Sequence, residues 1–192
     1  MEKDSPLFGI PNASASRMQP GFTLIELMVT LSVLGILLAI AVPNYITFIQ
    51  NARLTGQAND LVTSLNYARS EAIKRGVRVS VCSRFSDTAC AGAGVFNWDT
   101  GWLVFLNPNN DAVRDAGETV LQVRQALENG NTLRTAGLQR VTYQNTGFSG
   151  NMDKFRLCDT RGTASGRAIV VNMQGRVRTG ALINEIPALT CP

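Results

Sequence analysis

The chain opens with one continuous apolar stretch and then changes to an amphipathic pattern. Residues 22–42 contain a single charged side chain, Glu26. At a rise of about 1.5 Å per residue, a helix of this length spans the roughly 30 Å hydrocarbon core of a bilayer. The pattern therefore predicts a transmembrane helix over residues 22–42. A carboxylate inside such a helix is costly, so Glu26 is expected to have a partner and a function.

The helical pattern continues over residues 43–76. Apolar side chains recur there at alternating steps of four and three residues, which places them on one face of a helix. Lys74 and Arg75 suit the negative end of the helix dipole, and Gly76 is a favourable residue just past a helix. We expect an amphipathic helix whose apolar stripe packs on a sheet. The stripe consists of Leu54, Ala58, Leu61, Leu65, Ala68 and Ala72.

The remainder, residues 77–192, has the pattern of short strands. Runs of alternating character are separated by Gly, Asn, Asp and Ser. One helix followed by many strands predicts an α+β protein, in which a long N-terminal α-helix packs on a C-terminal antiparallel β-sheet domain in two layers. The polar stretch 126–137 is interpreted as a surface loop. The predicted strands are residues 77–82, 102–106, 119–123, 141–144, 155–158 and 167–172.

Composition excludes several function classes. The 192 residues include no histidine, which rules out Ser-His-Asp triads, histidine bases and His-ligated zinc or haem. The aspartates outside the motifs discussed below show no pairing with a nucleophile. We therefore expect no enzyme, no cofactor and no small-molecule substrate. The formal charge of +4 permits an acidic partner without requiring one.

Four cysteines indicate an oxidising compartment. They are Cys82, Cys90, Cys158 and Cys191, and none forms a CxxC motif of the zinc-ribbon or thioredoxin type. An even number beyond a membrane segment suggests two disulfides. Of the three pairings, we favour Cys82–Cys90, which closes a short loop, and Cys158–Cys191, which pins the C-terminus. Four reduced, buried thiols are the alternative.

The sequence GFTLIE at residues 21–26, directly opening the apolar stretch, carries a family signature. It resembles the cleavage and methylation motif of type IV prepilins and type II secretion pseudopilins. A secretory signal peptide and a plain single-pass anchor are the alternatives, and neither accounts for Glu26. The resemblance implies that residues 1–21 are a leader peptide, cut after Gly21 by a prepilin peptidase, and that Phe22 is N-methylated. It also implies that Glu26 pairs with the N-terminal amine of a neighbouring subunit and sets the register of assembly.

The C-terminal part resembles one branch of this group. The strand at residues 77–82, WLVF at 102–105, the Gly-Glu pair at 117–118 and GRVR at 175–178 are similar to the GspH/FimT family. That family includes the H-type minor pseudopilins and the FimU and FimT minor pilins.

The GspH/FimT resemblance implies a function in assembly. The chain would be a minor pilin that helps initiate or cap a type IV pilus with other minor and major pilins. The alternative is an H-type minor pseudopilin of a type II protein secretion system. The implied location is the bacterial inner membrane, with a cytoplasmic N-terminus and a periplasmic C-terminal domain, and then the tip of the pilus or pseudopilus.

The GRVR sequence is a candidate DNA site. In the FimT branch, a GRxR motif near the C-terminus is associated with DNA binding during natural transformation, and this chain matches it at Gly175, Arg176 and Arg178. The strand period places the two arginines on one face, about 6.6 Å apart. Arg161 and Arg167 lie nearby in sequence, and converging arginines could grip phosphates. A charged edge strand or a contact with neighbouring subunits is the alternative.

Residues 107–118 are a weak calcium candidate. Side chains with oxygen atoms occupy positions 1, 3, 5, 9 and 12 of this stretch, as in an EF-hand loop. Position 6 is Ala112 where glycine is usual, and the flanks are predicted strands. A polar hairpin loop is therefore the alternative interpretation. The oxygen-bearing residues are Asn107, Asn109, Asp111, Asp115 and Glu118.

Overall fold

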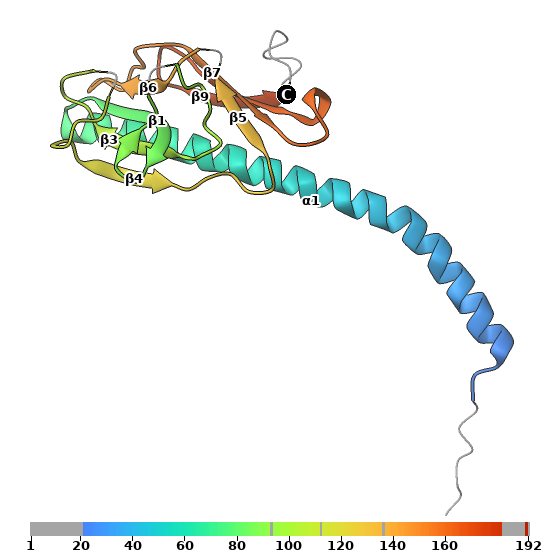
Figure 1. Cartoon of the computed structure of the whole chain (residues 1–192). Helices are drawn as coiled ribbons and strands as arrows, with labels where there is room; N and C mark the ends of the chain where they lie inside the picture. The colour runs from blue at the N-terminus through green and yellow to red at the C-terminus, as the bar shows by residue number, and fades with distance from the viewer. Residues whose placement is uncertain (1–20, 93, 112, 136, 182–190, 192) are drawn as a thin grey trace, which may run out of the picture. The chain divides into compact units, whose positions relative to one another are not determined.

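The computed structural model describes residues 21–92, 94–111, 113–135, 137–181 and 191. Of the predicted leader, only Gly21 is among the described residues. The chain divides into two compact units, Met1–Asn44 and Tyr45–Pro192. The helix α1 (Leu24–Arg75) contributes residues to both units and includes Pro43 (Figure 1).

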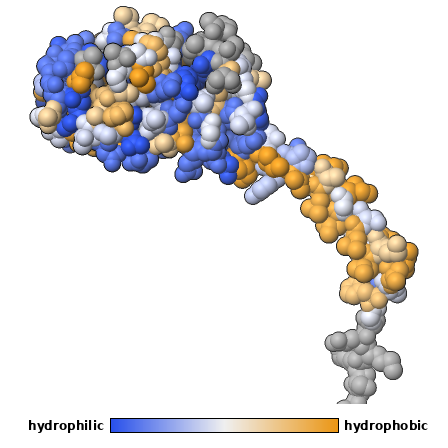
Figure 2. All heavy atoms as spheres, in the orientation of Figure 1, coloured by the Kyte–Doolittle hydropathy of each residue, from blue (hydrophilic) through white to orange (hydrophobic). Residues whose placement is uncertain are grey.

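The first unit contains the apolar half of α1. The helix starts at Leu24 because Thr23 caps it, with the backbone N–H of Glu26 donating to Thr23 Oγ1 at 3.2 Å. An 18-residue window of α1 has a mean hydropathy of 2.5, and none of it is buried. Figure 2 shows this part of the helix as a largely apolar surface. By length and composition, α1 is therefore suited to cross a membrane.

In the second unit, α1 packs through the predicted stripe. All six stripe residues are buried, and they belong to one core cluster with side chains from the strands. The cluster includes Trp98, whose ring meets Phe155 edge to face with centroids 4.9 Å apart. The predicted packing of an amphipathic helix on sheets is therefore confirmed. The helix packs through the stripe because burying these apolar side chains removes their surface from water.

The first sheet has five antiparallel strands with β1 (Val79–Ser86) at its centre. β3 (Trp102–Leu106) pairs with one edge of β1, and β6 (Arg140–Tyr143) pairs with the other. β4 (Val120–Arg124) extends the sheet beyond β3, and β2 (Ala89–Cys90) forms a short hairpin with the end of β1. The inward side chains of this first sheet belong to the same core cluster as the apolar stripe of α1.

The second sheet has four antiparallel strands. Their order is β5 (Thr132–Thr135), β7 (Asp153–Cys158), β8 (Arg167–Val171) and β9 (Val177–Ala181). A short 3-10 helix, η1 (Thr163–Ser165), precedes β8. The two sheets share the core cluster with α1, so the predicted α+β fold with antiparallel sheets is confirmed.

One prediction about the strands is wrong. The stretch 126–137 is not a loop throughout, because β5 lies within it and buries Leu133. This strand is four residues long and has one large apolar side chain. Its structure depends on pairing with β7, which a local pattern cannot reveal.

Both favoured disulfides are present. Cys82 and Cys90 are bonded across the β1–β2 hairpin, with α-carbons 5.7 Å apart. Cys158 at the end of β7 is bonded to Cys191, with α-carbons 5.9 Å apart. The pairing prediction is confirmed, and the second bond attaches Cys191 to the second sheet.

Candidate functional site

The GRVR sequence begins in a tight turn that leads into β9. The N–H of Gly175 donates to the carbonyl of Asn172, and the N–H of Arg176 donates to Asn172 Oδ1, both at 2.9 Å. Gly175 has a φ of +74°, and a Cβ there would stand 2.2 Å from the carbonyl oxygen of Gly147. Only glycine fits this position, so the motif glycine shapes the turn that presents Arg176.

Helix α1 holds this turn in place through Arg69. Its Nε donates to the carbonyl oxygen of Gly147, and its Nη2 donates to the carbonyl oxygen of Gln174, each at 3.0 Å. The turn is therefore attached to the long helix of the unit. Sequence reasoning missed Arg69, because a single arginine on a helix gives no signal of a contact so distant in sequence.

The second sheet has one face in the core and one outer face. Side chains alternate along a strand, and the core takes Leu133, Phe155, Leu157, Ile169 and Val171. The side chains at the intervening positions are on the opposite side, which we call the outer face. The outer face consists of Thr132, Arg134, Lys154, Arg156, Cys158, Ala168, Val170, Arg178 and Gly180.

Positive charge dominates the outer face. The outer-face residues include four cations, which are Arg134, Lys154, Arg156 and Arg178, and no acidic residue. Arg176, which is exposed, lies immediately before β9. Arg176 and Arg178 are exposed, and no described residue forms a hydrogen bond or ion pair with either guanidinium. Two unpaired guanidinium groups on a fixed backbone can each bind a phosphate oxygen.

Arg156 adds a cation that is partly withdrawn from water. It lies directly opposite Arg134 on the neighbouring strand, an arrangement in which like charges repel. Arg134 is ion-paired with Asp99, whereas no described residue pairs with Arg156. Burial lowers the pKa of Arg156, and the charge of Arg134 lowers it further. An anion bound at the outer face would relieve both effects.

The structure does not bring all four predicted arginines together. Arg161 forms an ion pair with Asp159 at 2.7 Å and donates to Asn51 on α1 at 2.9 Å. Arg167 lies on the core-side face of β8, where it lines a hollow with Ala58 of α1. Arg161 follows the end of β7 and is held by Asp159 and Asn51. Arg167 is on the opposite side of the second sheet from Arg178, because residues along a strand alternate between faces.

The sequence reasoning also missed Lys154 and Arg156. They flank Phe155 in β7, and a buried aromatic between two cations is a period-two signal that could have placed both on one outer face. Arg134 had no such signal, because its strand was not predicted.

The residues of the processing motif stand at the start of α1. Gly21 and Phe22 precede the helix, and Phe22 is 85% exposed. Glu26 lies in the first helical turn. The predicted cleavage position after Gly21 therefore lies in an exposed segment, which is where proteolytic cleavage is favoured.

The 107–118 stretch connects β3 to β4. The N–H of Asp115 donates to Glu118 Oε2 at 3.0 Å, and the Asn107 amide donates to Ser80 Oγ at 2.9 Å. Among the described residues, no group of three His, Cys, Asp or Glu side chains is close enough to hold a metal ion. Ala112 lies outside the described residues.

The geometry of helix, sheets and processing motif agrees with known proteins. A family model described as type II transport protein GspH matches residues 57–175, more than half of the chain. The chain belongs to the GspH family. A second model, the prokaryotic N-terminal methylation motif, matches residues 16–42 of this GspH-family chain. The predicted family is therefore confirmed.

Individual relatives are pilin-like proteins. The pilin-like protein PilA1 of Thermus thermophilus is 29% identical over 82% of this chain and 96% of its own length. The type IV major fimbrial protein FimA of Dichelobacter nodosus is 32% identical over 39% of this chain and only 38% of its own length. The type IV minor pilin FimU of Pseudomonas aeruginosa shares the fold with a TM-score of 0.54 at 18% identity, covering 69% of this chain and 92% of that one.

These matches define the protein at a coarse level. It is a member of the type II transport protein GspH family with an N-methylation motif, and its helix α1 is long and apolar enough to cross a membrane.

Proposed function

We propose that this GspH-family protein is a minor pilin that captures DNA at its outer face during natural transformation. The observation that carries the proposal is the pair of exposed, unpaired guanidinium groups of Arg176 and Arg178, presented by a turn that Arg69 fixes. Lys154 and Arg156 continue the same positive surface onto β7. A phosphate backbone is the ligand that such a surface fits.

The expected binding is independent of base sequence. Residues 161–192 contain no aromatic side chain on which a base could stack. Phosphate contacts from four cations, Arg176, Arg178, Lys154 and Arg156, give weak binding at physiological salt. The Kd for such non-specific binding is in the range of about 10⁻⁴–10⁻⁶ M. Several subunits at a pilus tip would strengthen it through multivalency.

The second candidate is an H-type minor pseudopilin of a type II secretion system. The match to the type II transport protein model supports it. In that case the outer face contacts neighbouring subunits, and the arginines pair with their carboxylates. The two candidates share the fold and differ in the ligand of the outer face.

DNA binding by the full-length protein in detergent micelles separates the candidates. We expect labelled duplex DNA to bind the wild type, and Arg176→Ala/Arg178→Ala to weaken binding at least about tenfold, because a cation that no longer meets a phosphate releases no counterion from the DNA. The matched control, Arg53→Ala/Lys74→Ala, removes the same charge from the exposed surface of α1 and should bind within about twofold of wild type. Equal binding by both double variants, or none by the wild type, would leave assembly or secretion as the function.

We also infer the steps of assembly from the family and the start of α1. A prepilin peptidase cuts after Gly21, and Phe22 becomes the methylated N-terminus. The N-terminus is cytoplasmic, and the second unit is periplasmic until the subunit joins the tip. Glu26, in the first helical turn, then pairs with the N-terminal amine of a neighbour. In lipid, a carboxylate and an ammonium each need such a partner.

A further inference from the structure

Three large apolar side chains are exposed close to the turn of the GRVR sequence. They belong to Phe148, Met152 and Met173, which are each more than half exposed, and we call them the apolar patch. Met152 immediately precedes Asp153, which pairs with Val171 of β8, so Met152 lies close to Met173 just beyond the end of that strand. Exposed apolar side chains that are grouped mark interaction sites more often than single ones do. The patch therefore points to a ligand with an apolar surface.

Phe148 and Arg176 are both next to one close backbone contact. The turn residue Gly175 lies against Gly147, since a Cβ on Gly175 would stand 2.2 Å from the carbonyl oxygen of Gly147. Phe148 follows Gly147 in the chain, and Arg176 follows Gly175, so each is one residue from this contact. Arg69 donates to backbone carbonyls of both segments. An aromatic residue and an unpaired guanidinium group are therefore held at neighbouring places on the surface.

Backbone hydrogen bonds also fix the segments that present the patch. The N–H of Ser149 donates to the carbonyl oxygen of Met173 at 3.0 Å, and the N–H of Gln144 donates to the carbonyl oxygen of Phe148 at 2.8 Å. The backbone of the patch is thus ordered before any ligand arrives. A ligand that binds there is spared the free-energy cost of ordering a loop.

The charge around the patch favours an anion. Residues 144–152 and 172–178 include the cations Arg176 and Arg178 and no acidic residue. A ligand that fits must therefore combine negative charge with a flat apolar surface. Single-stranded DNA has both, because its unpaired bases expose their faces while its phosphates carry the charge. Duplex DNA presents the phosphates but keeps the base faces stacked on one another.

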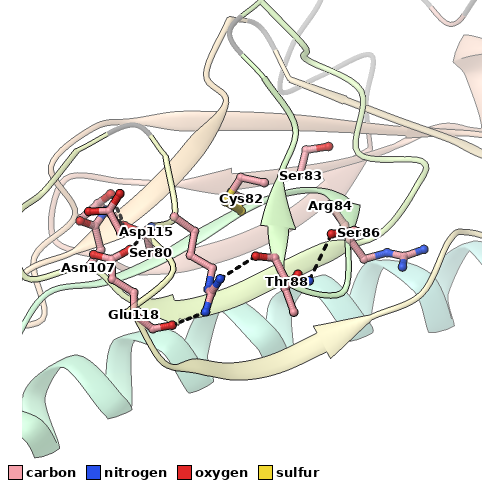
Figure 3. The surroundings of a disulfide bond; sticks show 12 residues. Ser80, Cys82, Ser83, Arg84, Ser86, Thr88, Asn107, Asp115 and Glu118 are labelled. Carbon is pink, nitrogen blue, oxygen red and sulfur yellow. Dashed lines mark hydrogen bonds between the residues drawn. A yellow bond between two sulfur atoms is a disulfide. The ribbon is translucent and has the colours of Figure 1, made fainter.

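A second exposed phenylalanine lies in a different setting. Phe85 is 80% exposed and follows Arg84 on β1, which Figure 3 shows together with the disulfide-bonded Cys82. The Nη1 of Arg84 is ion-paired with Asp87 Oδ1 at 2.7 Å, so its charge is already compensated. Phe85 has the exposure of a stacking residue without an unpaired arginine beside it in sequence, and it is the matched control for Phe148.

We infer that the apolar patch and the arginines beside it bind single-stranded DNA in preference to duplex DNA, with a base stacked on Phe148 and the adjoining phosphates on Arg176 and Arg178. The inference rests on the proposed DNA capture and adds the form of DNA that is captured. Phe148 supplies the aromatic side chain that residues 161–192 lack, and the polarizable thioethers of Met152 and Met173 extend the surface for the base. Every base has a stacking face, so binding stays independent of base sequence.

Three DNA ligands of equal length separate stacking from charge. They are an oligothymidylate strand, an abasic strand with the same number of phosphates, and a duplex, each titrated at one salt concentration against the full-length protein in detergent micelles. The wild type should bind oligothymidylate at least about fivefold more tightly than the abasic strand, which is the lower end of what one stacked base contributes. It should also bind oligothymidylate more tightly than the duplex.

Variants at Phe148 test the role of the ring. Phe148→Ala should weaken oligothymidylate binding at least about fivefold and leave abasic-strand binding and the salt dependence unchanged, because no phosphate contact is lost. Phe148→Trp should retain tight binding. Phe148→Leu, which is apolar but has no aromatic face, should behave like Phe148→Ala. Phe85→Ala should bind all three ligands as the wild type does. Since Phe148 is exposed, each variant should keep the urea midpoint of the wild type.

The outcomes distinguish this inference from the proposed function. Equal binding of oligothymidylate and the abasic strand by the wild type, or equal effects of Phe148→Ala and Phe85→Ala, would overturn the inference and leave phosphate capture intact. The patch would then be a contact for a neighbouring subunit. Failure of the wild type to bind any of the three ligands, or unchanged abasic-strand binding by Arg176→Ala/Arg178→Ala, would overturn the inference and the proposed function together.

Discussion

Lys154 and Arg178 are aligned across the second sheet, one on each side of Val170 and all on the outer face. Neighbouring strands are about 4.8 Å apart, so the α-carbons of the two cations are roughly 10 Å apart. The positive surface therefore arises from strand register, which joins residues of β7 and β9 that are distant in sequence. Its geometry depends on the turn that sets where β9 begins.

Gly175→Ala tests that turn. The variant adds a methyl group 2.2 Å from the carbonyl oxygen of Gly147 and forces alanine to a φ of +74°. We expect a loss of about 3 kcal/mol in the free energy of unfolding, measured by urea denaturation, and weaker DNA binding although both arginines are present. Gly76→Ala is the control, since Gly76 follows helix α1 with a φ of +68° but nothing stands within 4 Å of the new methyl group. It should cost only about 1 kcal/mol, and equal losses would refute the steric account.

Asp153→Asn should change how stability depends on pH. Burial raises the pKa of Asp153 to about 8, while an unfolded aspartate titrates near pH 4. Between about pH 4 and 8, Asp153 is therefore protonated in the folded state and ionised in the unfolded state. The contribution of Asp153 to the free energy of unfolding is complete below that window and is lost as the pH rises through it.

Urea unfolding at pH 5 and pH 8 measures this effect. The wild type should lose about 2–4 kcal/mol more between these values than Asp153→Asn, which cannot titrate there. Asp87→Asn, at an exposed aspartate, should behave like the wild type. Parallel pH profiles for wild type and Asp153→Asn would contradict the assignment of a buried, neutral carboxyl group.

The two disulfides should contribute unequally to stability. The Cys158–Cys191 bond closes a separation of 33 residues, against 8 for Cys82–Cys90. Loop-closure entropy predicts a loss of about 4 kcal/mol for Cys158→Ser/Cys191→Ser and about 2.5 kcal/mol for Cys82→Ser/Cys90→Ser. Urea midpoints of the two variants give the comparison. A larger loss for the hairpin bond would show that local packing around β2 outweighs chain entropy.

Processing and assembly are testable at the N-terminus. Protein purified from a host with the peptidase should begin at N-methylated Phe22 by intact mass. Glu26→Ala should leave the second unit folded, because Glu26 lies in the other unit, yet reduce incorporation into fibres. Glu26→Gln keeps the shape and removes the charge, so it should fail as Glu26→Ala does. An unprocessed mass, or normal incorporation of both variants, would refute these roles.

The local sequence pattern was sufficient to predict elements whose structure depends on a single segment of the chain. The stripe from Leu54 to Ala72 could be predicted because a helix with one apolar face must bury it. The strand Trp102–Leu106 could be predicted from its composition. The GRxR motif singled out Gly175 in the sequence. The structure explains why this residue is glycine, because a Cβ there would stand too close to the carbonyl oxygen of Gly147.

Long-range pairing decided what the sequence could not show. β5 is a strand because β7 pairs with it, and the outer face joins Arg134, Lys154 and Arg178 through three registers. Arg161 looked free in sequence, but folding brings it to Asp159 and Asn51. No local pattern encodes such contacts, so the sequence pointed to Arg176 and Arg178 of the candidate site but not to Lys154 and Arg156 on β7.

The salt dependence of DNA binding tests the central claim most directly. Binding of duplex DNA to the wild type should give a slope of log K against log salt of about −3 to −4, as expected for four phosphate contacts. Arg176→Ala/Arg178→Ala and Lys154→Ala/Arg156→Ala should each make the slope shallower by about two. Unchanged slopes in both variants would show that DNA does not bind the outer face.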